Sequence, residues 1–291
     1  MRSPVVDFAK MEGIGNKILV VDMRGCIESI SLDVIKILSM DSSTNFDQIM
    51  SIHDSQDKFF DAFIRIINND GSEAQSCGNG MRCVVRFLLN KIKKKDFTFK
   101  TIRGIITAKE NSDRSISVDM GEPIFNFYYI PLAKPFDDAD RYQFCIGPIN
   151  NLYLQSPFVV SMGNPHAIFF VEDDIFKYDL VGFGQHLESH VLFPEGVNLS
   201  IARVNSPSSI DLRTWERGVG LTAACGSAAC ASVVASGSLG KTDRIVSVKM
   251  LGGKLMIEWS HNNHVFMTGD ANKEWDGKLD VKTGKWIKNK F

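Results

Sequence analysis

The feature that most constrains the fold of this chain is an internal repeat built around two Cys-Gly steps. The segment NNDGSEAQSCGNGMRC (68–83) has a later counterpart in ERGVGLTAACGSAAC (216–230). Each begins with polar residues, passes through Gly and reaches Cys-Gly where a helical pattern starts, at Cys77 and at Cys225. The two steps lie about half the chain length apart, a spacing that predicts two related half-molecules.

A second repeated motif supports the same division into two related halves. GIGN (13–16) and MGNPH (162–166) each place Gly-Asn next to a strand-like run. A chain of 291 residues is long enough for about two domains with cores of their own. We therefore expect an N-terminal lobe over residues 1–124, completed by residues 276–291, and a C-terminal lobe over residues 125–275.

Short strand-like runs outnumber helical patterns along the chain. The runs are rich in Val, Ile and Phe and occupy residues 5–11, 17–22, 59–67, 97–102, 115–120, 158–162, 167–171, 197–204, 209–215, 244–250 and 254–259. Helices are expected over residues 31–39, 77–90, 179–190 and 225–236. Because strands and helices do not alternate regularly, the pattern indicates an α+β fold rather than a doubly wound sheet.

The charge balance excludes several classes of function. The 33 Lys+Arg are matched by 34 Asp+Glu, for a net charge of -1, which gives no overall field to hold nucleic acid or an anionic membrane. No apolar run near the start has the length of a signal peptide, and no window approaches ~18 consecutive apolar residues. We expect a cytoplasmic protein whose cysteines stay reduced.

The repeated Cys-Gly steps favour acid/base chemistry. A helix N-terminus offers unpaired N–H groups and partial positive charge, which lower a thiol pKa from ~8.5 towards neutrality and can hold a carboxylate. A small acid held by two such helix starts would have a thiol on each face of its α-carbon. Because that arrangement can invert a stereocentre, Cys77 and Cys225 are the expected catalytic residues.

The other cysteines are expected to have simpler roles. Cys83 and Cys230 lie inside their helical segments, where a thiol usually fills the core, and Cys26 and Cys145 have no motif around them. Neither cysteine pair has the spacing of a zinc knuckle, and HLESH (186–190) has Leu where a zinc protease motif has Glu. We therefore expect no metal.

Taken together, these motifs resemble those of the diaminopimelate epimerase family. The two cysteine segments are similar to the family's two cysteine motifs, and KMEGIGN (10–16), MGNPHAIFFVED (162–173) and FPEGVN (193–198) also match in order and spacing. The resemblance implies two pseudo-symmetric lobes, each a mostly antiparallel curved sheet around a central helix. It also implies a cofactor-independent homodimer that interconverts L,L- and meso-diaminopimelate for lysine and peptidoglycan synthesis.

The same resemblance implies the residues of the site. Cys77 and Cys225 would form the acid/base pair, with His166 and Glu216 as further catalytic candidates. The substrate-binding residues that it implies are Asn16, Gln48, Asn68, Gly78, Asn79, Asn164, Asn198, Glu216, Arg217, Gly226 and Ser227. In such a set, Arg217 can bind a carboxylate with two hydrogen bonds and Glu216 can pair with an ammonium group.

Three places depart from the family pattern. Lys17 and Ile18 follow Gly-Asn where the family usually has Asp-Phe, and Leu221 stands where an acidic residue is common. Residues 42–45 (SSTN) replace a basic residue and a Gly-rich turn. The changes leave both thiols in place and alter the loop that leads to Gln48.

Other functions fit part of the pattern. Proline and hydroxyproline racemases also pair two thiols, but their substrates have one ammonium and one carboxylate and would leave Arg217 without a partner. A redox-switch binding protein would instead join Cys77 and Cys225 in a disulfide. Phenazine-type isomerases share the architecture implied by the resemblance but lack the cysteine pair.

Overall fold

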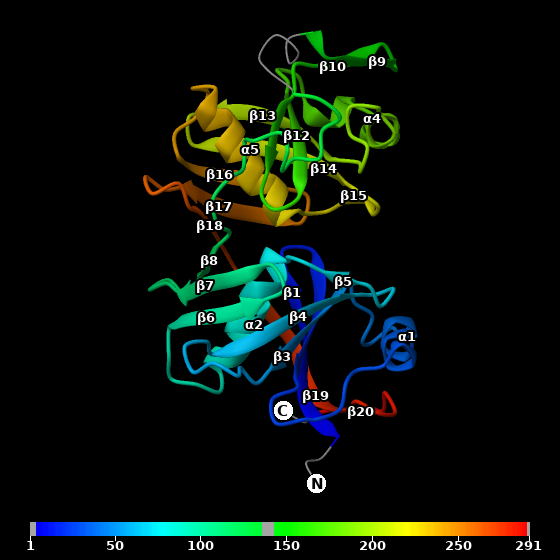
Figure 1. The fold of residues 1–291 in the computed structure, drawn as a ribbon, viewed down its shortest axis with the longest axis vertical. Coiled ribbons are helices and arrows are strands. Elements are labelled where there is room, and N and C mark those ends of the chain that lie inside the picture. Colours follow the sequence, from blue (N-terminus) through cyan, green and yellow to red (C-terminus); the bar gives the residue numbers. More distant parts are fainter. Residues whose placement is uncertain (1–3, 136–142, 290–291) are drawn as a thin grey trace. The chain divides into compact units, whose positions relative to one another are not determined.

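The computed structural model describes residues 4–135 and 143–289, and the chain forms two compact units (Figure 1). The first unit comprises residues 1–119 and 268–291, and the second comprises residues 120–267. The chain re-enters the first unit earlier than residue 276, because the whole of one late strand, β19 (Asn272–Asp280), pairs there. No helix within the described ranges is both long and apolar enough to span a membrane.

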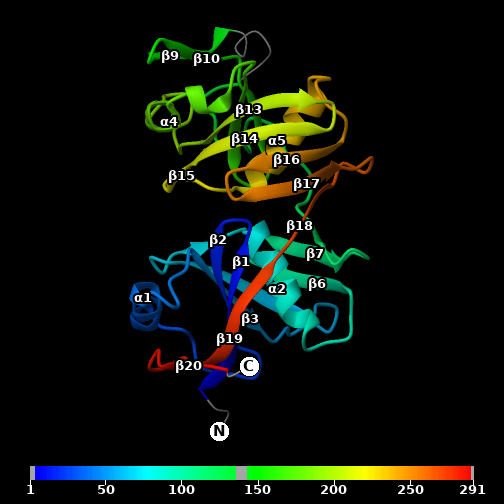
Figure 2. The same ribbon diagram turned by 180° about the vertical axis from the view of Figure 1, so that it is seen from behind.

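The first unit contains ten strands and two helices among its described residues. The strands are β1 (Val5–Gly13), β2 (Asn16–Asp22), β3 (Gln48–His53), β4 (Ala62–Asn68), β5 (Glu73–Ala74), β6 (Asp96–Thr101), β7 (Gly104–Glu110), β8 (Ile116–Asp119), β19 and β20 (Trp286–Lys288). The helices are α1 (Leu32–Met40) and α2 (Gly78–Leu89). Figure 2 shows β19 running beside β1.

Strand pairing in the first unit produces one curved sheet. Its order is β20–β19–β1–β2–β3–β4–β6–β7–β8, with β5 folded back on β4. All neighbours are antiparallel except β2 with β3 and β4 with β6. Helix α2 contacts strands from both halves of this order, from β19 and β1 to β7 and β8, so the sheet wraps around it.

Helix α2 forms the core of the first unit because most of its residues are apolar or small. Its apolar residues, among them Met81 and Leu88, are buried. Gly80 is favoured at its position, since a Cβ there would lie only 2.4 Å from the Met50 Sδ of β3. The close approach of helix and sheet fixes where α2 begins, and therefore where Cys77 lies.

The second unit has ten strands, two α-helices and one 3-10 turn among its described residues. The strands are β9 (Cys145–Ile149), β10 (Leu152–Gln155), β11 (Phe158–Ser161), β12 (Pro165–Phe170), β13 (Asn198–Ser206), β14 (Ser209–Glu216), β15 (Gly220–Thr222), β16 (Ile245–Met250), β17 (Gly253–Trp259) and β18 (Val265–Gly269), the last of which crosses the unit boundary. The helical elements are η1 (Ile175–Lys177), α4 (Leu180–Glu188) and α5 (Gly226–Ser238).

The second unit repeats the topology of the first. Strands β11–β12–β13–β14–β16–β17 pair in that order, with β12/β13 and β14/β16 parallel and the remaining neighbours antiparallel. The matching order in the first unit is β1–β2–β3–β4–β6–β7, with its parallel pairs in the same places. Helix α5 contacts all six of these strands, and Figures 1 and 2 show it lying against the sheet of the second unit. The predicted repeat and the α+β class are confirmed.

Candidate active site

In the first unit, Cys77 is the N-cap of α2. Its backbone is extended (φ -151°, ψ 94°), and its Sγ accepts a hydrogen bond of 3.1 Å from the Gly80 N–H. Gly78 and Asn79 are the first two residues of the helix, and both are buried. The sulfur therefore lies at the positive end of the helix, as the sequence predicted.

A carboxylate orders the amides next to Cys77. The Asn79 amide N donates to the Asn16 Oδ1, and the Asn16 amide N lies 3.5 Å from the Asp47 Oδ2, which also accepts from the Lys17 N–H at 2.8 Å. Because a carboxylate can only accept, it fixes the orientation of Asn16 and then of Asn79. In this orientation the buried Asn79 Oδ1 has no hydrogen-bond partner among the described residues. It can therefore accept a hydrogen bond from a bound ligand.

Gln48 and Asn68 form a second amide pair in the first unit. They lie opposite each other on the antiparallel strands β3 and β4, and the Gln48 amide N donates to the Asn68 Oδ1 at 2.9 Å. Asn68 also donates to the Ser72 hydroxyl at 2.9 Å. Gln48, the first residue of β3, follows Asp47 directly, so the two amide groups are joined at the end of the loop whose residues 42–45 depart from the family pattern.

In the second unit, Cys225 holds the corresponding position at the N-cap of α5. It is only 5% exposed, and its Sγ lies 3.4 Å from the Ser227 hydroxyl. Burial raises the pKa of the Cys225 thiol well above its ordinary value, and the nearby Glu216 carboxylate raises it further. The Ser227 hydroxyl and the Ala228 N–H lower the pKa but do not outweigh these effects.

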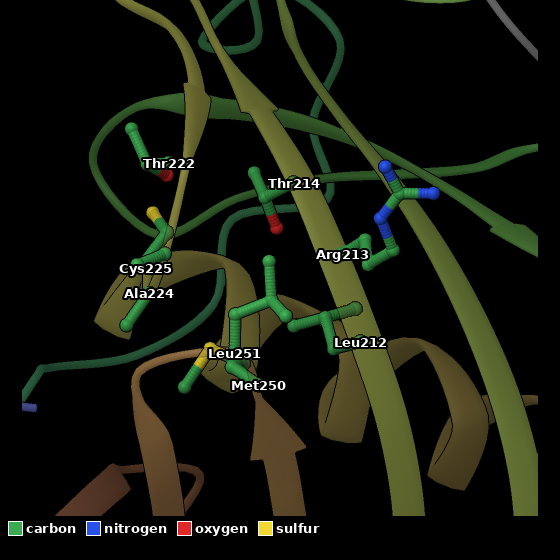
Figure 3. A pocket seen from close by; sticks show the side chains of 9 residues that line it. Leu212, Arg213, Thr214, Thr222, Ala224, Cys225, Met250 and Leu251 are labelled. Atoms are coloured by element: carbon green, nitrogen blue, oxygen red, sulfur yellow. The ribbon is translucent and has the colours of Figure 1, made fainter. Parts of the chain in front are cut away.

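The expectation that both helix starts lower the pKa of their thiols is therefore wrong for Cys225. The cause lies in the tertiary structure, because the burial of Cys225 and the Glu216 charge both depend on strands that pack around the start of α5. Thr222 on β15 donates to the Glu216 Oε1 at 2.6 Å and thereby holds the carboxylate in place. Figure 3 shows Thr222 and Cys225 with Thr214, Met250 and Leu251 around a narrow gap.

His166 is fully buried in the second unit and is joined to the Cys225 helix. Its Nε2 lies 3.1 Å from both the Ser227 Oγ and the Asn164 Oδ1, and the Asn164 amide N donates to the same hydroxyl at 3.3 Å. Burial lowers the pKa of His166 to about 3, and the Arg217 charge contributes. His166 is thus neutral near pH 7, and its contacts orient Ser227.

The remaining predicted residues of the second unit converge on the turn after β14. The Asn198 side chain donates to the Pro165 carbonyl at 2.8 Å and accepts from the Arg217 N–H at 2.9 Å. The Arg217 guanidinium donates to the Glu195 carbonyl at 3.0 Å. Asn198 therefore links the Asn164–His166 segment to Glu216–Arg217.

The structure thus brings the predicted residues together in two groups, one in each unit. The first group is Asn16, Gln48, Asn68, Cys77, Gly78 and Asn79. The second group is Asn164, His166, Asn198, Glu216, Arg217, Cys225, Gly226 and Ser227. Sequence reasoning missed Asp47 and Thr222, which hold members of these groups by hydrogen bonds. The signal for Asp47 was its place directly before Gln48.

Solved structures define the class of fold. A phenazine biosynthesis protein of the PhzF family from Bacillus anthracis matches with a TM-score of 0.67, covering 96% of this chain and 99% of that chain at 14% identity. A hydroxyproline epimerase from Agrobacterium vitis, with bound trans-4-OH-L-proline, matches with a TM-score of 0.64, covering 96% and 92% at 14% identity. The chain shares the pseudo-symmetric α+β fold of this class.

Sequence comparison then defines the family. The model of the diaminopimelate epimerase family matches residues 8–126 and 158–274. A diaminopimelate epimerase of Rhizobium leguminosarum bv. trifolii (strain WSM2304) is 51% identical over 292 residues, which cover 99% of this chain and 97% of that protein. This chain belongs to the diaminopimelate epimerase family, as its motifs predicted.

Proposed function

We propose that the protein epimerises L,L-diaminopimelate to meso-diaminopimelate without a cofactor. The observation that carries the proposal is the pair of thiols at equivalent helix starts of a repeated fold, Cys77 before α2 and Cys225 before α5. Membership of the diaminopimelate epimerase family supports the choice of substrate. The product is a precursor of lysine and, in bacteria, of peptidoglycan cross-links.

The proposed reaction needs one cysteine as a thiolate and the other as a protonated thiol. A thiolate takes the α-proton, so a C–H bond breaks and an S–H bond forms, while the opposite thiol gives its proton to the other face of the α-carbon. Each turnover therefore exchanges the roles of donor and acceptor. The raised pKa of Cys225 favours its thiol form before substrate binds, while the direction of the reaction decides which cysteine acts as the base.

The helix-start N–H groups are proposed to hold the reacting carboxylate and the charge that develops on it. An amino-acid α-proton is far less acidic than a thiol, and each pKa unit of mismatch costs ~1.4 kcal/mol. The N–H groups of Gly78, Asn79, Gly226 and Ser227 are fixed in the first turns of their helices. Donors that are fixed before the reaction need no reorganisation in the transition state, which is why they lower the barrier effectively. His166 acts in this scheme through Ser227 rather than by donating a proton.

The remaining polar groups of the substrate are assigned to Arg217, Glu216 and the side-chain amides. Arg217 is proposed to bind the distal carboxylate with two hydrogen bonds, while Glu216 and the amide oxygens accept from ammonium groups. The unpartnered Asn79 Oδ1 is such an acceptor. Lysine, which lacks the distal carboxylate, would leave the Arg217 donors unpaired and should be rejected.

Location and assembly are proposed by analogy with the family. The protein is assigned to the cytoplasm, where the reduced state of its thiols is maintained, and to a homodimer. Light scattering after size-exclusion chromatography of the full chain tests the second assignment, since a single monomer peak at assay concentrations contradicts it.

The central experiment incubates the protein with L,L-diaminopimelate in D2O under reducing conditions. Meso product carrying solvent deuterium at the α-carbon, formed without added cofactor, is the expected result. Cys77→Ala and Cys225→Ala should each abolish it, and near-normal turnover by either variant contradicts the two-base mechanism. Exchange on proline or hydroxyproline, and none on diaminopimelate, would favour a racemase instead.

A further inference from the structure

The segment of the second unit that reads HLESH (186–190) contacts the loop that carries Glu216 and Arg217. Glu188 is the last residue of α4, and its two carboxylate oxygens bind different donors. Oε1 accepts from the Gly218 N–H at 2.7 Å, and Oε2 accepts from the Trp215 indole N–H at 3.1 Å. These donors flank the Glu216–Arg217 pair on either side.

The Gly218 end of this loop needs such support. Arg217, Gly218 and Val219 form the turn between β14 and β15, with the Val219 N–H donating to the Glu216 carbonyl at 3.0 Å. Gly218 has a positive φ of 72° and Val219 is largely exposed. The contact from Glu188 therefore ties an otherwise exposed turn to a helix end.

The Trp215 end is held by close packing as well. Gly184 of α4 lies against the indole ring, and a Cβ at that position would overlap the ring atoms. Helix α4 therefore reaches Trp215 through two contacts, the bare backbone of Gly184 and the carboxylate of Glu188. Together these contacts fix the position of Trp215 at the end of β14, and therefore the position of the Glu216–Arg217 pair that follows it.

The chain that follows HLESH contacts the same arginine. The Glu195 carbonyl accepts from the Arg217 guanidinium at 3.0 Å, and a Cβ on Gly196 would lie only 3.1 Å from the Arg217 Cγ and Cδ. Gly196 has a positive φ of 71°, so the turn that presents this carbonyl favours glycine. The segment from Glu188 to Gly196 thus contacts both the side chain of Arg217 and the turn that carries it.

We propose that Glu188 is a positioning residue that sets the affinity of Arg217 for the distal carboxylate of the substrate. The role rests on the proposed epimerase function. Both oxygens of Glu188 are needed, because a single acceptor can satisfy the turn or the indole but not both. Glu188 itself does not touch the reacting atoms.

The test uses Glu188→Gln in the full chain, with Gln185→Ala as a matched control on the exposed side of α4. The amide NH2 that this substitution introduces must face one of the two donors, so one hydrogen bond is lost. We expect KM for L,L-diaminopimelate to rise about tenfold or more, as loss of a hydrogen bond to a charged group implies, while kcat changes little. The control should match the unchanged protein.

A double-mutant cycle separates positioning from general destabilisation. If Glu188 acts through Arg217, Glu188→Gln should leave the KM of an Arg217→Ala variant unchanged within about twofold. The same rise in both backgrounds overturns the proposal, as does an unchanged KM in the single variant. Amide exchange at Gly218 and the Trp215 indole NMR signal, identified with Trp215→Phe, should both change in Glu188→Gln; unchanged signals also overturn it.

The failure of this role and the failure of the function give different results. An unaltered protein that exchanges no α-proton of L,L-diaminopimelate overturns the proposed function, and with it the substrate-linked role of Glu188. An active protein whose Glu188→Gln variant keeps its KM overturns the role of Glu188 alone.

Discussion

Replacing Ser227 by Ala tests how the second unit controls its thiol. The Ser227 hydroxyl lies 3.4 Å from the Cys225 Sγ and 3.1 Å from the His166 Nε2, and it accepts from Asn164 at 3.3 Å. The Asn164 Oδ1 can only accept, so the His166 Nε2 beside it is assigned the ring proton. That N–H and the Asn164 amide are then both directed at the Ser227 oxygen, which leaves the hydroxyl proton for the sulfur. A hydrogen bond to a charged acceptor contributes roughly 1.5–3 kcal/mol. Since about 1.4 kcal/mol is a factor of ten, kcat/KM should fall about ten- to a hundredfold.

The assay follows epimerisation from both L,L- and meso-diaminopimelate. The equilibrium constant is unchanged, so kcat/KM must fall by the same factor in both directions. Ser232→Ala is the matched control, because it removes a buried serine of the same helix whose hydroxyl bonds only the Ala229 carbonyl at 2.8 Å among the described residues. A folded Ser227→Ala protein with kcat/KM within about twofold of the unchanged chain would refute the reasoning.

Three other perturbations follow from the same contacts. Asp47→Ala removes the acceptor that orients Asn16, so KM should rise about tenfold; steady-state kinetics test this, and an unchanged KM contradicts it. Glu216→Gln removes a charge that raises the pKa of Cys225, so alkylation of that thiol, followed by mass spectrometry, should begin at lower pH, and an unshifted profile argues against the assignment. His166 has its pKa lowered from 6.5 to about 3, so the unfolded chain takes up a proton first as pH falls. The free energy of unfolding should therefore decrease between about pH 6.5 and about pH 3, and less so in His166→Asn; equal slopes in urea titrations would disagree.

The repeat could be predicted from sequence because each half carries its own local signals. A cysteine followed by Gly at a helix start is visible in both halves, and the helices begin at Gly78 and Gly226. The expected helix at 77–90 therefore agrees with the observed α2 within a residue at each end.

The strands that sequence reasoning missed depend on long-range pairing. Strand β3 is a short, almost wholly buried run that has no alternation to mark it. Strand β19 has a polar sequence, and it is a strand because it pairs along β1. Its local signal was a weak alternation, with Trp275, Gly277 and Leu279 at every second position between polar residues. These three residues are the buried ones.

The pKa of Cys225 could not be predicted for a related reason. The helix start is a local feature, and it acts in the expected direction through the Ala228 N–H. Burial and the Glu216 carboxylate act in the opposite direction, and both arise from strands whose approach cannot be read from the residues around the thiol. The grouping of these residues within each unit could be predicted from motifs, whereas the balance of charges around the Cys225 thiol could not.

The discontinuity of the first unit has a consequence for how the chain matures during synthesis. The second unit ends at residue 267, while the first still lacks β19, whose Trp275 and Leu279 belong to its core beside Phe8. A nascent chain can therefore complete the second unit on the ribosome while the first remains open along the whole edge of β1. The segment translated after the second unit closes that edge, so a chain stalled before β19 would expose apolar surface from the half that was made first.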